Sequence, residues 1–389
     1  MSHDPTVASL PDGEVYLRRR VDLWSSPELE GLDAFLVTAP IHHRYLCGFS
    51  GSSAHLVLTR DGSQFLTDGR YAEQSAHEVR EADIVIADGP LRNALGGHLE
   101  SWWKVGFEAG WLTIAELKLL EESCPGITWV PVTDCMERLR AVKDEHEIAS
   151  LRGAAIIACQ VLRHVASGVE PGQSEREIAG DLEGNLRKAG SEGSAFEPIV
   201  VSGAGSSRPH GKASDRVIEE GECLTIDFGA ILNGYHSDLT RTFVTGTPKD
   251  EYLEWQEVLD RAIETTLAAL EPGIPCQELD RVARAVIDSA GFGEYFVHNL
   301  GHGIGLEVHE APHLSRTSAG SLAVGMVFTI EPGIYVPGHG GMRIEEDVLM
   351  TENGPELLTR FSRSLALPEP ESFSKRFLGA EQKSDGNNS

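Results

Sequence analysis

The feature that most constrains the fold is an internal repeat in the C-terminal part of the chain. The motif Glu170-Pro171-Gly172 recurs 101 residues later as Glu271-Pro272-Gly273. Further matches follow in the same order, and they pair residues 225–229 with residues 329–333. In each half a helical pattern precedes the Glu-Pro-Gly turn, and a second helix and acid-bearing strands follow it. This ordered series predicts duplication of one structural unit, with two halves related by a pseudo-two-fold axis.

A hairpin signal in the first half brings two acids together. Two strand-like segments flank Asn233-Gly234, a dipeptide typical of two-residue hairpin turns. Counting outward from this turn places Asp227 opposite Thr240, with Asp238 as the diagonal neighbour of Asp227 on the same sheet face. Two carboxylates on one strand pair repel each other, and strands disfavour Asp, so a bound cation would stabilise the arrangement. Two solvated acids on an exposed face would explain this pair equally well.

The second half repeats the arrangement of acids. Glu331 lies at the end of a strand-like segment, and Glu345 follows a Pro- and Gly-rich turn over residues 337–341. A pseudo-two-fold axis would bring both pairs of carboxylates to one point, where two divalent cations would neutralise their charge. Oxygen-rich sites suit Mn²⁺, Co²⁺, Fe²⁺ or Zn²⁺, and a pair of such metals can activate a bridging water.

A histidine flanked by glycines is the candidate nitrogen ligand. His302 lies in Gly301-His302-Gly303-Ile304-Gly305, and His309 follows seven residues later. The glycines do not form the G-x-G-x-x-G pattern of dinucleotide-binding loops, and no strand-turn-helix context follows. They indicate close approach of the backbone around the imidazole. As a nitrogen ligand, this imidazole would favour transition metals over Mg²⁺. A surface or core role is the alternative for a lone histidine.

The remaining sequence predicts the domain organisation. Residues 1–137 alternate strand-like and helical segments, which is typical of an α/β domain of ordinary size. The segment 138–143 is rich in Arg and Lys, and we expect it to link this domain to a catalytic domain over residues 144–364. Residues 365–389 are polar, so we expect a flexible tail there.

Charge and cysteine content narrow the function classes. With 33 basic and 60 acidic residues, the formal charge of −27 opposes binding to nucleic acid or to anionic lipid. No run of 18 apolar residues is present to span a bilayer, and the N-terminus shows no secretory signal. The six cysteines form no Cys-x-x-Cys pair. We therefore expect reduced thiols and a cytoplasmic protein with neither nucleic acid nor membrane as a partner.

Five blocks of sequence together resemble the pita-bread metallopeptidases. The blocks are residues 227–229, 237–242, 301–310, 329–333 and 343–346. The resemblance is closest to the proline-specific branch, which contains Xaa-Pro dipeptidase (prolidase) and Xaa-Pro aminopeptidase (aminopeptidase P). Residues 48–52 and 67–71 also resemble the N-terminal domain of that branch. The resemblance implies an α+β protein, in which an α/β creatinase-like domain precedes a pita-bread domain with pseudo-two-fold duplication.

The resemblance also implies a pair of divalent metal ions, with Mn²⁺ favoured and Co²⁺ or Zn²⁺ as alternatives. Five side chains match the metal ligands of the family, namely Asp227, Asp238, His302, Glu331 and Glu345. Asp238 and Glu345 would bridge the two ions. Asp227 would chelate one ion, and His302 with Glu331 would complete the coordination of the other.

Roles in the reaction follow from the same resemblance. Glu331 would also carry a proton from water to the leaving nitrogen, and His309 would donate a hydrogen bond to the scissile carbonyl, an oxyanion-hole role. His210 matches a second substrate-facing histidine, with a capped loop as the alternative explanation. Arg343 matches an arginine that pairs with an acid of the site, with a surface ion pair as the alternative. The implied substrates are proline-containing dipeptides or oligopeptides, and the implied assembly is a homodimer.

Several alternatives stay open at this point. A dipeptidase must bind the C-terminal carboxylate of its substrate, usually with an arginine, and Arg316 is the candidate, although an exposed loop arginine would fit equally well. We favour the dipeptidase over an aminopeptidase that acts on longer peptides. A metal-free hydrolase of the creatinase kind, or a non-catalytic module that binds peptides or histones, would lack the five ligands. Methionine aminopeptidase shares these ligands but lacks an N-terminal domain of this size.

Overall fold

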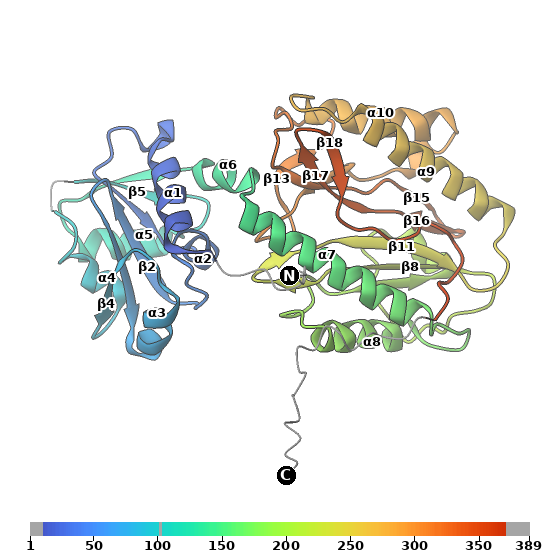
Figure 1. Ribbon diagram of the computed structural model, residues 1–389, viewed down its shortest axis with the longest axis horizontal. Coiled ribbons are helices and arrows are strands. Elements are labelled where there is room, and N and C mark those ends of the chain that lie inside the picture. The colour runs from blue at the N-terminus through green and yellow to red at the C-terminus, as the bar shows by residue number, and fades with distance from the viewer. Residues whose placement is uncertain (1–10, 101–102, 371–389) are drawn as a thin grey trace, which may run out of the picture. The chain divides into compact units, whose positions relative to one another are not determined.

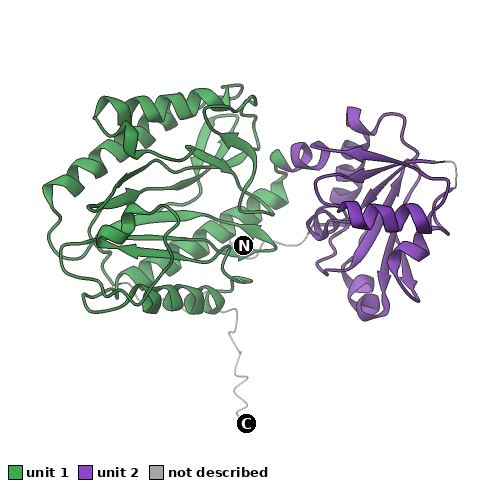
Figure 2. Ribbon diagram, turned by 180° about the vertical axis from the view of Figure 1, so that it is seen from behind, with its two compact units in different colours: residues 1–8, 141–389 green, residues 9–140 purple. Residues whose placement is uncertain are grey.

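The computed structural model describes residues 11–100 and 103–370, and it contains two compact units that divide between Arg140 and Ala141 (Figure 2). The division falls inside the segment where the sequence predicted a linker. Helix α6 (Cys135–Ala141) occupies the first part of that segment, so the chain is helical up to the division. Each unit is described below by itself.

The N-terminal unit is built on one mixed six-stranded sheet with the order β4-β3-β2-β1-β5-β6. Its strands are β1 (Ala34–Val37), β2 (Ala54–Thr59), β3 (Ser63–Asp68), β4 (Asp83–Ala87), β5 (Lys104–Glu108) and β6 (Thr128–Val132). Its other helices are α1 (Gly13–Trp24), α2 (Pro40–Cys47), α3 (Ala72–Glu78), α4 (Leu91–Leu95) and α5 (Ile114–Ser123). Strands β1, β2 and β3 are antiparallel neighbours, whereas β4, β5 and β6 join in parallel. This is the α/β architecture that the alternating pattern predicted.

Two helix pairs and a set of short sheets form the C-terminal unit (Figure 1). The helices are α7 (Glu145–Ala166), α8 (Glu175–Lys188), α9 (Asp250–Ala269) and α10 (Cys276–Ser289). Asp144 begins α7 with a capping box, because its side chain accepts from the backbone N–H of Glu147 and the Glu147 side chain accepts in return. Helices α7 and α8 pack on the strands of the first half, and α9 and α10 pack on those of the second. The two halves thus have the same order of elements, as the repeat predicted.

The strands of the C-terminal unit fall into four sheets, with orders β11-β8-β7, β13-β12-β14-β17-β18, β10-β9 and β15-β16. The strands of the first half are β7 (Ile199–Ser202), β8 (Cys223–Phe228), β9 (Ile231–Leu232), β10 (Tyr235–His236) and β11 (Leu239–Val244). Those of the second half are β12 (Gly301–Gly303), β13 (Glu310–Leu314), β14 (Val327–Ile330), β15 (Gly333–Val336), β16 (Gly340–Arg343), β17 (Glu346–Thr351) and β18 (Gly354–Leu357).

The hairpin of the first half has the predicted register. Asn233 and Gly234 both have positive φ, 51° and 78°, and Leu232 pairs with Tyr235 across the turn. Farther out, Asp227 of β8 pairs with Thr240 of β11. The Asn-Gly turn therefore fixes which residues of the two strands face each other, because its twist matches that of the strands.

The second half departs from the prediction at its last acid. The sequence predicted one strand over residues 342–349, but the chain changes sheets in the middle of that segment. β16 ends at Arg343 and pairs with β15, whereas β17 begins at Glu346 and pairs with β14. Glu345 lies at the crossover, and its backbone N–H donates to Thr240 O of the first half at 3.2 Å. This crossover joins the two halves at their centre.

Ordered packing continues past the predicted end of the catalytic domain. Leu365 is buried, and Ala366 forms a bridge with Val244 at the end of β11. The apolar contact offered by Leu365 explains why the chain stays attached beyond residue 364. Residues 371–389, which make up most of the predicted tail, lie outside the described residues.

Helix α7 is long and apolar enough to cross a membrane by length and composition alone. However, 56% of its most apolar 18-residue window is buried inside the structure. Its buried face packs against the sheet β11-β8-β7 in one hydrophobic core with Leu182 and Phe228. Its composition is therefore explained by its place as a core helix.

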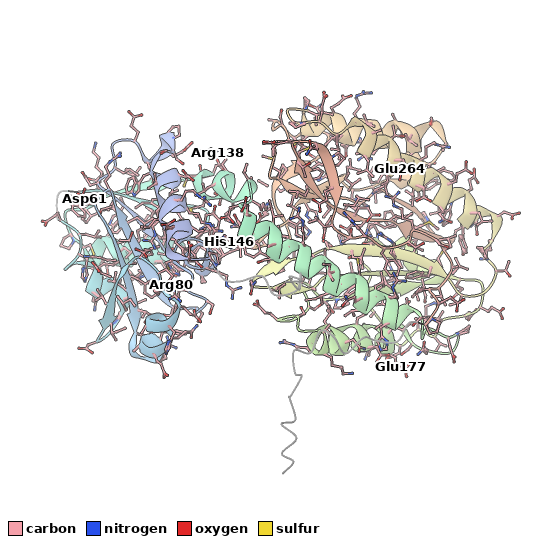
Figure 3. The ribbon with its side chains drawn as sticks, viewed as in Figure 1. Asp61, Arg80, Arg138, His146, Glu177 and Glu264 are labelled. Carbon is pink, nitrogen blue, oxygen red and sulfur yellow. The ribbon has the colours of Figure 1, made fainter. Side chains whose placement is uncertain are left out.

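Most acidic side chains of the described residues lie on the surface. Glu177 on α8 and Glu264 on α9 are exposed examples, and both are labelled in Figure 3. A small group of acids at the centre of the C-terminal unit is different, because its members are buried.

Candidate active site

Four carboxylates from both halves of the repeat meet at the centre of the C-terminal unit. Asp227 lies on β8, Asp238 between β10 and β11, Glu331 directly after β14, and Glu345 at the crossover between β16 and β17. Asp227, Asp238 and Glu345 are 7%, 4% and 2% exposed, respectively. Carboxylates are rarely buried to this extent without paired cations, so the cluster requires a physical explanation.

His302 on β12 completes the cluster. Its Nε2 lies 3.3 Å from Glu331 Oε1 and 3.9 Å from Asp238 Oδ2. One ligand atom each from Asp238, His302 and Glu345 lie within 4.8 Å of one another. The structure therefore brings all five predicted ligands to one place.

The glycines beside His302 allow this close approach. A Cβ on Gly301 would collide with the carbonyl oxygen of Thr329, and a Cβ on Gly303 would collide with that of Ala311. Only glycine lets β12 lie this close to its neighbours, which confirms the predicted backbone crowding around the imidazole.

The electrostatics of the cluster fit a bound cation. Burial, followed by the charges of Glu345 and Asp227, raises the pKa of Asp238 well above its usual value. Burial, with Glu331 and Asp227 next, does the same for the pKa of Glu345. Asp227 Oδ1 and Asp238 Oδ1 are buried and accept no hydrogen bond from the described residues. Unpartnered, mutually repelling carboxylate oxygens beside one imidazole form the donor set that divalent transition metals prefer.

A buried arginine holds the Asp227 side of the cluster. Arg343 on β16 is 4% exposed, and its Nη2 donates to Asp227 Oδ2. Its Nε donates to Thr240 Oγ1 at 3.1 Å, and Thr240 in turn donates to Glu345 Oε2 at 2.5 Å. Arg343 is therefore a buried partner of a site acid and not a surface ion pair.

Histidines line one side of the cluster. The rings of His309 and His302 meet edge to face with their centroids 4.3 Å apart. Burial, followed by the nearby His302, lowers the pKa of His309, so its ring stays neutral and retains one N–H donor. His210 is exposed in the loop after β7, and it is one of the neighbours that lower the pKa of His298 and His309, after burial as the main cause.

The sequence did not predict two neighbours of the cluster, His298 and Asp347. His298 Nε2 lies 2.9 Å from Tyr335 Oη, which also accepts from Arg343 Nη1 at 2.7 Å. Asp347 is buried behind Asp238 and accepts from the Asp238 backbone N–H at 3.0 Å, and burial raises the pKa of Asp347 to about 8. The available signals were the four-residue spacing between His298 and His302, and the run of three acids that ends at Asp347.

Arg316 is the predicted site residue for which the described residues show no contact with the cluster. It lies exposed in the turn after β13. Among the described residues, no side chain of the cluster forms a hydrogen bond with it. Its proposed contact with a substrate carboxylate stays a prediction.

A buried ion pair on α10 fixes the segment that leads to His302. Arg284 binds Asp280 through two hydrogen bonds of 2.9 and 3.0 Å, and it donates to the carbonyls of Phe296 and His298. Asp280 Oδ1 also accepts from the Leu300 backbone N–H at 3.2 Å. The helix thereby sets the path of the chain into β12, because these contacts hold the carbonyls of Phe296 and His298 and the N–H of Leu300.

Two family models match this chain and define its class. The model described as metallopeptidase family M24 matches residues 149–352, and the model described as the creatinase/prolidase N-terminal domain matches residues 26–142. The chain belongs to the M24 metallopeptidase family. The match confirms the predicted pita-bread and creatinase-like domains and the prediction of a metallopeptidase, and it implies divalent metal ions as cofactors.

Individual relatives extend over nearly the whole chain. The Xaa-Pro dipeptidase of Pyrococcus furiosus is 35% identical over 86% of this chain and 95% of its own length. The solved structure of an Xaa-Pro dipeptidase from Bacillus anthracis has a TM-score of 0.87 at 37% identity, covering 90% of this chain and 99% of that one. An X-Pro aminopeptidase from Thermotoga maritima has a TM-score of 0.83 at 37% identity, covering 86% and 97%.

Proposed function

We propose that this metallopeptidase hydrolyses Xaa-Pro bonds and acts foremost as an Xaa-Pro dipeptidase. The observation that carries the proposal is the cluster of four carboxylates and His302, in which two buried carboxylate oxygens, Asp227 Oδ1 and Asp238 Oδ1, accept no hydrogen bond from the described residues. Relatives that carry the name Xaa-Pro dipeptidase cover nearly the full length of this chain. The complete set of candidate ligands argues against a metal-free hydrolase and against a non-catalytic binding module.

The cluster is proposed to hold two divalent ions, Mn²⁺ in the first place. Asp238 and Glu345 would be the ligands shared by the two ions, Asp227 would bind one of them, and His302 with Glu331 would bind the other. When bound there, such ions would polarise a peptide carbonyl and lower the pKa of a water molecule. Metal analysis of protein purified without chelator tests this, because Mn, Co, Fe or Zn at no more than trace level would contradict it.

The chain's own side chains supply the remaining chemistry. Glu331 lies 3.3 Å from the His302 ring and can accept a proton at one carboxylate oxygen and return it to the leaving nitrogen. His309, kept neutral by burial, can donate to the carbonyl oxygen as negative charge develops there. Arg343 keeps Asp227 in place and compensates part of the buried negative charge.

This chemistry suits a bond to proline. The Xaa-Pro bond is a tertiary amide without an N–H, so peptidases that bind the amide hydrogen of the residue after the bond cannot hold it in the usual way. Donation from His309 to the carbonyl oxygen needs no such hydrogen. The site can therefore act on a proline amide without any change in its donor set.

An Xaa-Pro aminopeptidase is the second candidate, because the Thermotoga maritima aminopeptidase is as identical to this chain as the Bacillus anthracis dipeptidase. The deciding experiment measures turnover of Ala-Pro and of Ala-Pro-Ala by the Mn²⁺-loaded protein. Higher kcat/KM for Ala-Pro supports the dipeptidase, and higher kcat/KM for the tripeptide supports the aminopeptidase. The Arg316→Ala variant then tests carboxylate recognition, with a raised KM for Ala-Pro as the expected result.

A cytoplasmic homodimer is part of the proposal. All six cysteines are free thiols, and five of them are buried. Free thiols are typical of a reducing compartment.

Light scattering coupled to size-exclusion chromatography measures the proposed homodimeric assembly, and a mass near 42.2 kDa would contradict the dimer.

A further inference from the structure

The loop over residues 203–213 carries His210, and Arg343 of the site contacts the carbonyl of the preceding Pro209. The loop begins where β7 ends at Ser202, and it returns to the first helix pair at Ser214. His210 itself is exposed, so buried packing does not fix its position. The contacts at the ends of the loop are therefore important for its geometry.

One buried carboxylate joins both ends. Glu175, the first residue of α8, is 1% exposed. Its Oε1 accepts from the backbone N–H and the hydroxyl of Ser202 at 2.7 and 2.8 Å. Its Oε2 accepts from the backbone N–H and the hydroxyl of Ser214 at 3.1 and 2.7 Å. Four donors from the two ends of the loop thus converge on a single side chain.

The surrounding contacts support this clamp. The start of α8 also binds the outgoing chain through its backbone, since Glu175 N donates to Arg216 O and Arg176 N donates to Ser214 O, both at 3.0 Å. Arg216 donates from its guanidinium to the hydroxyl of Ser202 and to Glu222. On the Ser202 side, the Glu175 carboxylate is thus the group that ties the end of β7 to α8.

The loop is also attached to the centre of the site. Ser206 Oγ accepts from Gly341 N at 2.8 Å, on the strand that carries Arg343. Arg343 Nη1 donates to the carbonyl of Pro209 at 3.4 Å, directly before His210. A clamp at the ends and two contacts in the middle would hold His210 at a fixed distance from Asp227.

We propose that Glu175 is a positioning residue for His210, which acts on the substrate through the loop that Glu175 closes. The proposal rests on the proposed function for the role of His210. Hydrogen bonds to an ionised carboxylate are about twice as strong as neutral ones, and joining the loop ends removes much of the conformational freedom of the loop. Glu175 has no contact with the five candidate ligands, so its effect on metal binding should be small.

The test compares Glu175→Gln with Glu177→Gln. Both variants change one acid of α8 to its amide. Glu177 is exposed on α8 (Figure 3), and its side chain accepts from the backbone N–H of the N-cap residue Ser174. Gln can also fill this role in a capping box. Glu175→Gln presents an amide NH₂ where an oxygen now meets two donors. We expect amide hydrogen exchange over residues 203–213 to become about tenfold faster in Glu175→Gln, since about 1.4 kcal/mol corresponds to a factor of ten. In Glu177→Gln it should stay unchanged.

Kinetics separate positioning from a general loss of structure. In Glu175→Gln, kcat/KM for Ala-Pro should fall about tenfold at unchanged metal content, since a 1.36 kcal/mol change in barrier is tenfold in rate. In a His210→Ala background, the same substitution should have less than a twofold effect, because the group it positions is absent. A full tenfold loss in that background, or unchanged exchange in the loop, would overturn the proposal.

Two further controls keep the result interpretable. If Glu175→Gln lowers the Tm strongly, Ser214→Ala removes one donor at one end of the loop and should cause a smaller change in the same direction. A wild-type protein that is loaded with metal but inactive on Xaa-Pro peptides would contradict the proposed function. Hydrogen exchange would then still decide whether Glu175 closes the loop, with slow exchange in Glu175→Gln as the contradicting result.

Discussion

The C-terminal unit should lose much of its stability when one partner of the buried ion pair between Lys143 and Glu310 is removed. The two side chains are 0% and 6% exposed, and Lys143 Nζ lies 2.7 Å from Glu310 Oε1. Replacing Lys143 with Met preserves most of the volume but removes the buried countercharge of the carboxylate. Breaking a buried pair in this way costs about 3–5 kcal/mol.

The expected change in Tm follows from the size of the unit. In a domain of about 150–250 residues, 1 kcal/mol corresponds to about 2–4 °C, so Lys143→Met should lower the Tm by about 6–20 °C. Differential scanning calorimetry can follow the C-terminal unit separately from the N-terminal one. Activity should fall as well, because Glu310 directly follows His309 and accepts from the Glu307 backbone N–H.

An exposed pair of the same chemistry provides the control. Lys212 Nζ lies 2.6 Å from Glu197 Oε2, but these side chains are 76% and 69% exposed. Exposed pairs contribute only about 0–1 kcal/mol, so Lys212→Met should hardly change the Tm. The double variant Lys143→Met/Glu310→Gln should recover at least half of the lost Tm. A shift below about 3 °C in Lys143→Met, or no recovery in the double variant, would refute the reasoning.

Three further predictions concern the site and the N-terminal unit. Asp238→Ala should lose both metals and activity, and a loss below about tenfold with full metal content would contradict the bridging role. His309→Ala should keep its metal and lose about 10²–10³ in kcat, whereas His302→Ala should lose metal from one site, and metal analysis would reveal swapped roles. Burial lowers the pKa of His43 and His55 to about 4 from the unfolded value of 6.5. The unfolded chain therefore binds more protons between these values, and the Tm of the N-terminal unit should be highest above pH 6.5 and fall toward pH 4. A constant Tm over that range would argue against this.

Local signals predicted the first half of the site well. The dipeptide Asn233-Gly234 specifies a turn type whose twist fits only one register of the flanking strands, and this register placed Asp227 opposite Thr240. The repeat then predicted that a second pair of acids would lie at an equivalent place. Both inferences use information that lies within a few residues of each feature, or in the comparison of one half with the other.

The crossover at Glu345 could not be predicted in the same way. Residues 342–345 alternate between apolar and polar side chains as a strand does, but the choice of partner strand depends on segments far away in the chain. Arg343 faces Gly333, whereas Glu346 faces Ile330, so the chain changes partners within three residues. Packing between the two halves decides this strand pairing. The hydrophobic periodicity of the sequence contains no information about it.

The sequence did not predict the groups that support the site either, and a comparison of the two halves of the repeat explains why. At the offset of 101 residues, Glu175 of α8 corresponds to Cys276 of α10. Cys276 is fully buried and cannot accept four hydrogen bonds. In the second half, the Asp280–Arg284 ion pair one helical turn farther along holds the following segment instead. Duplication thus preserves the helices and the strands, which are set by apolar periodicity. The loops that each helix must hold have diverged, and the polar side chains that hold them diverged with the loops. A sequence comparison between the halves finds candidate metal ligands because both halves contribute to one centre. It does not find Glu175, because the other half has no equivalent residue.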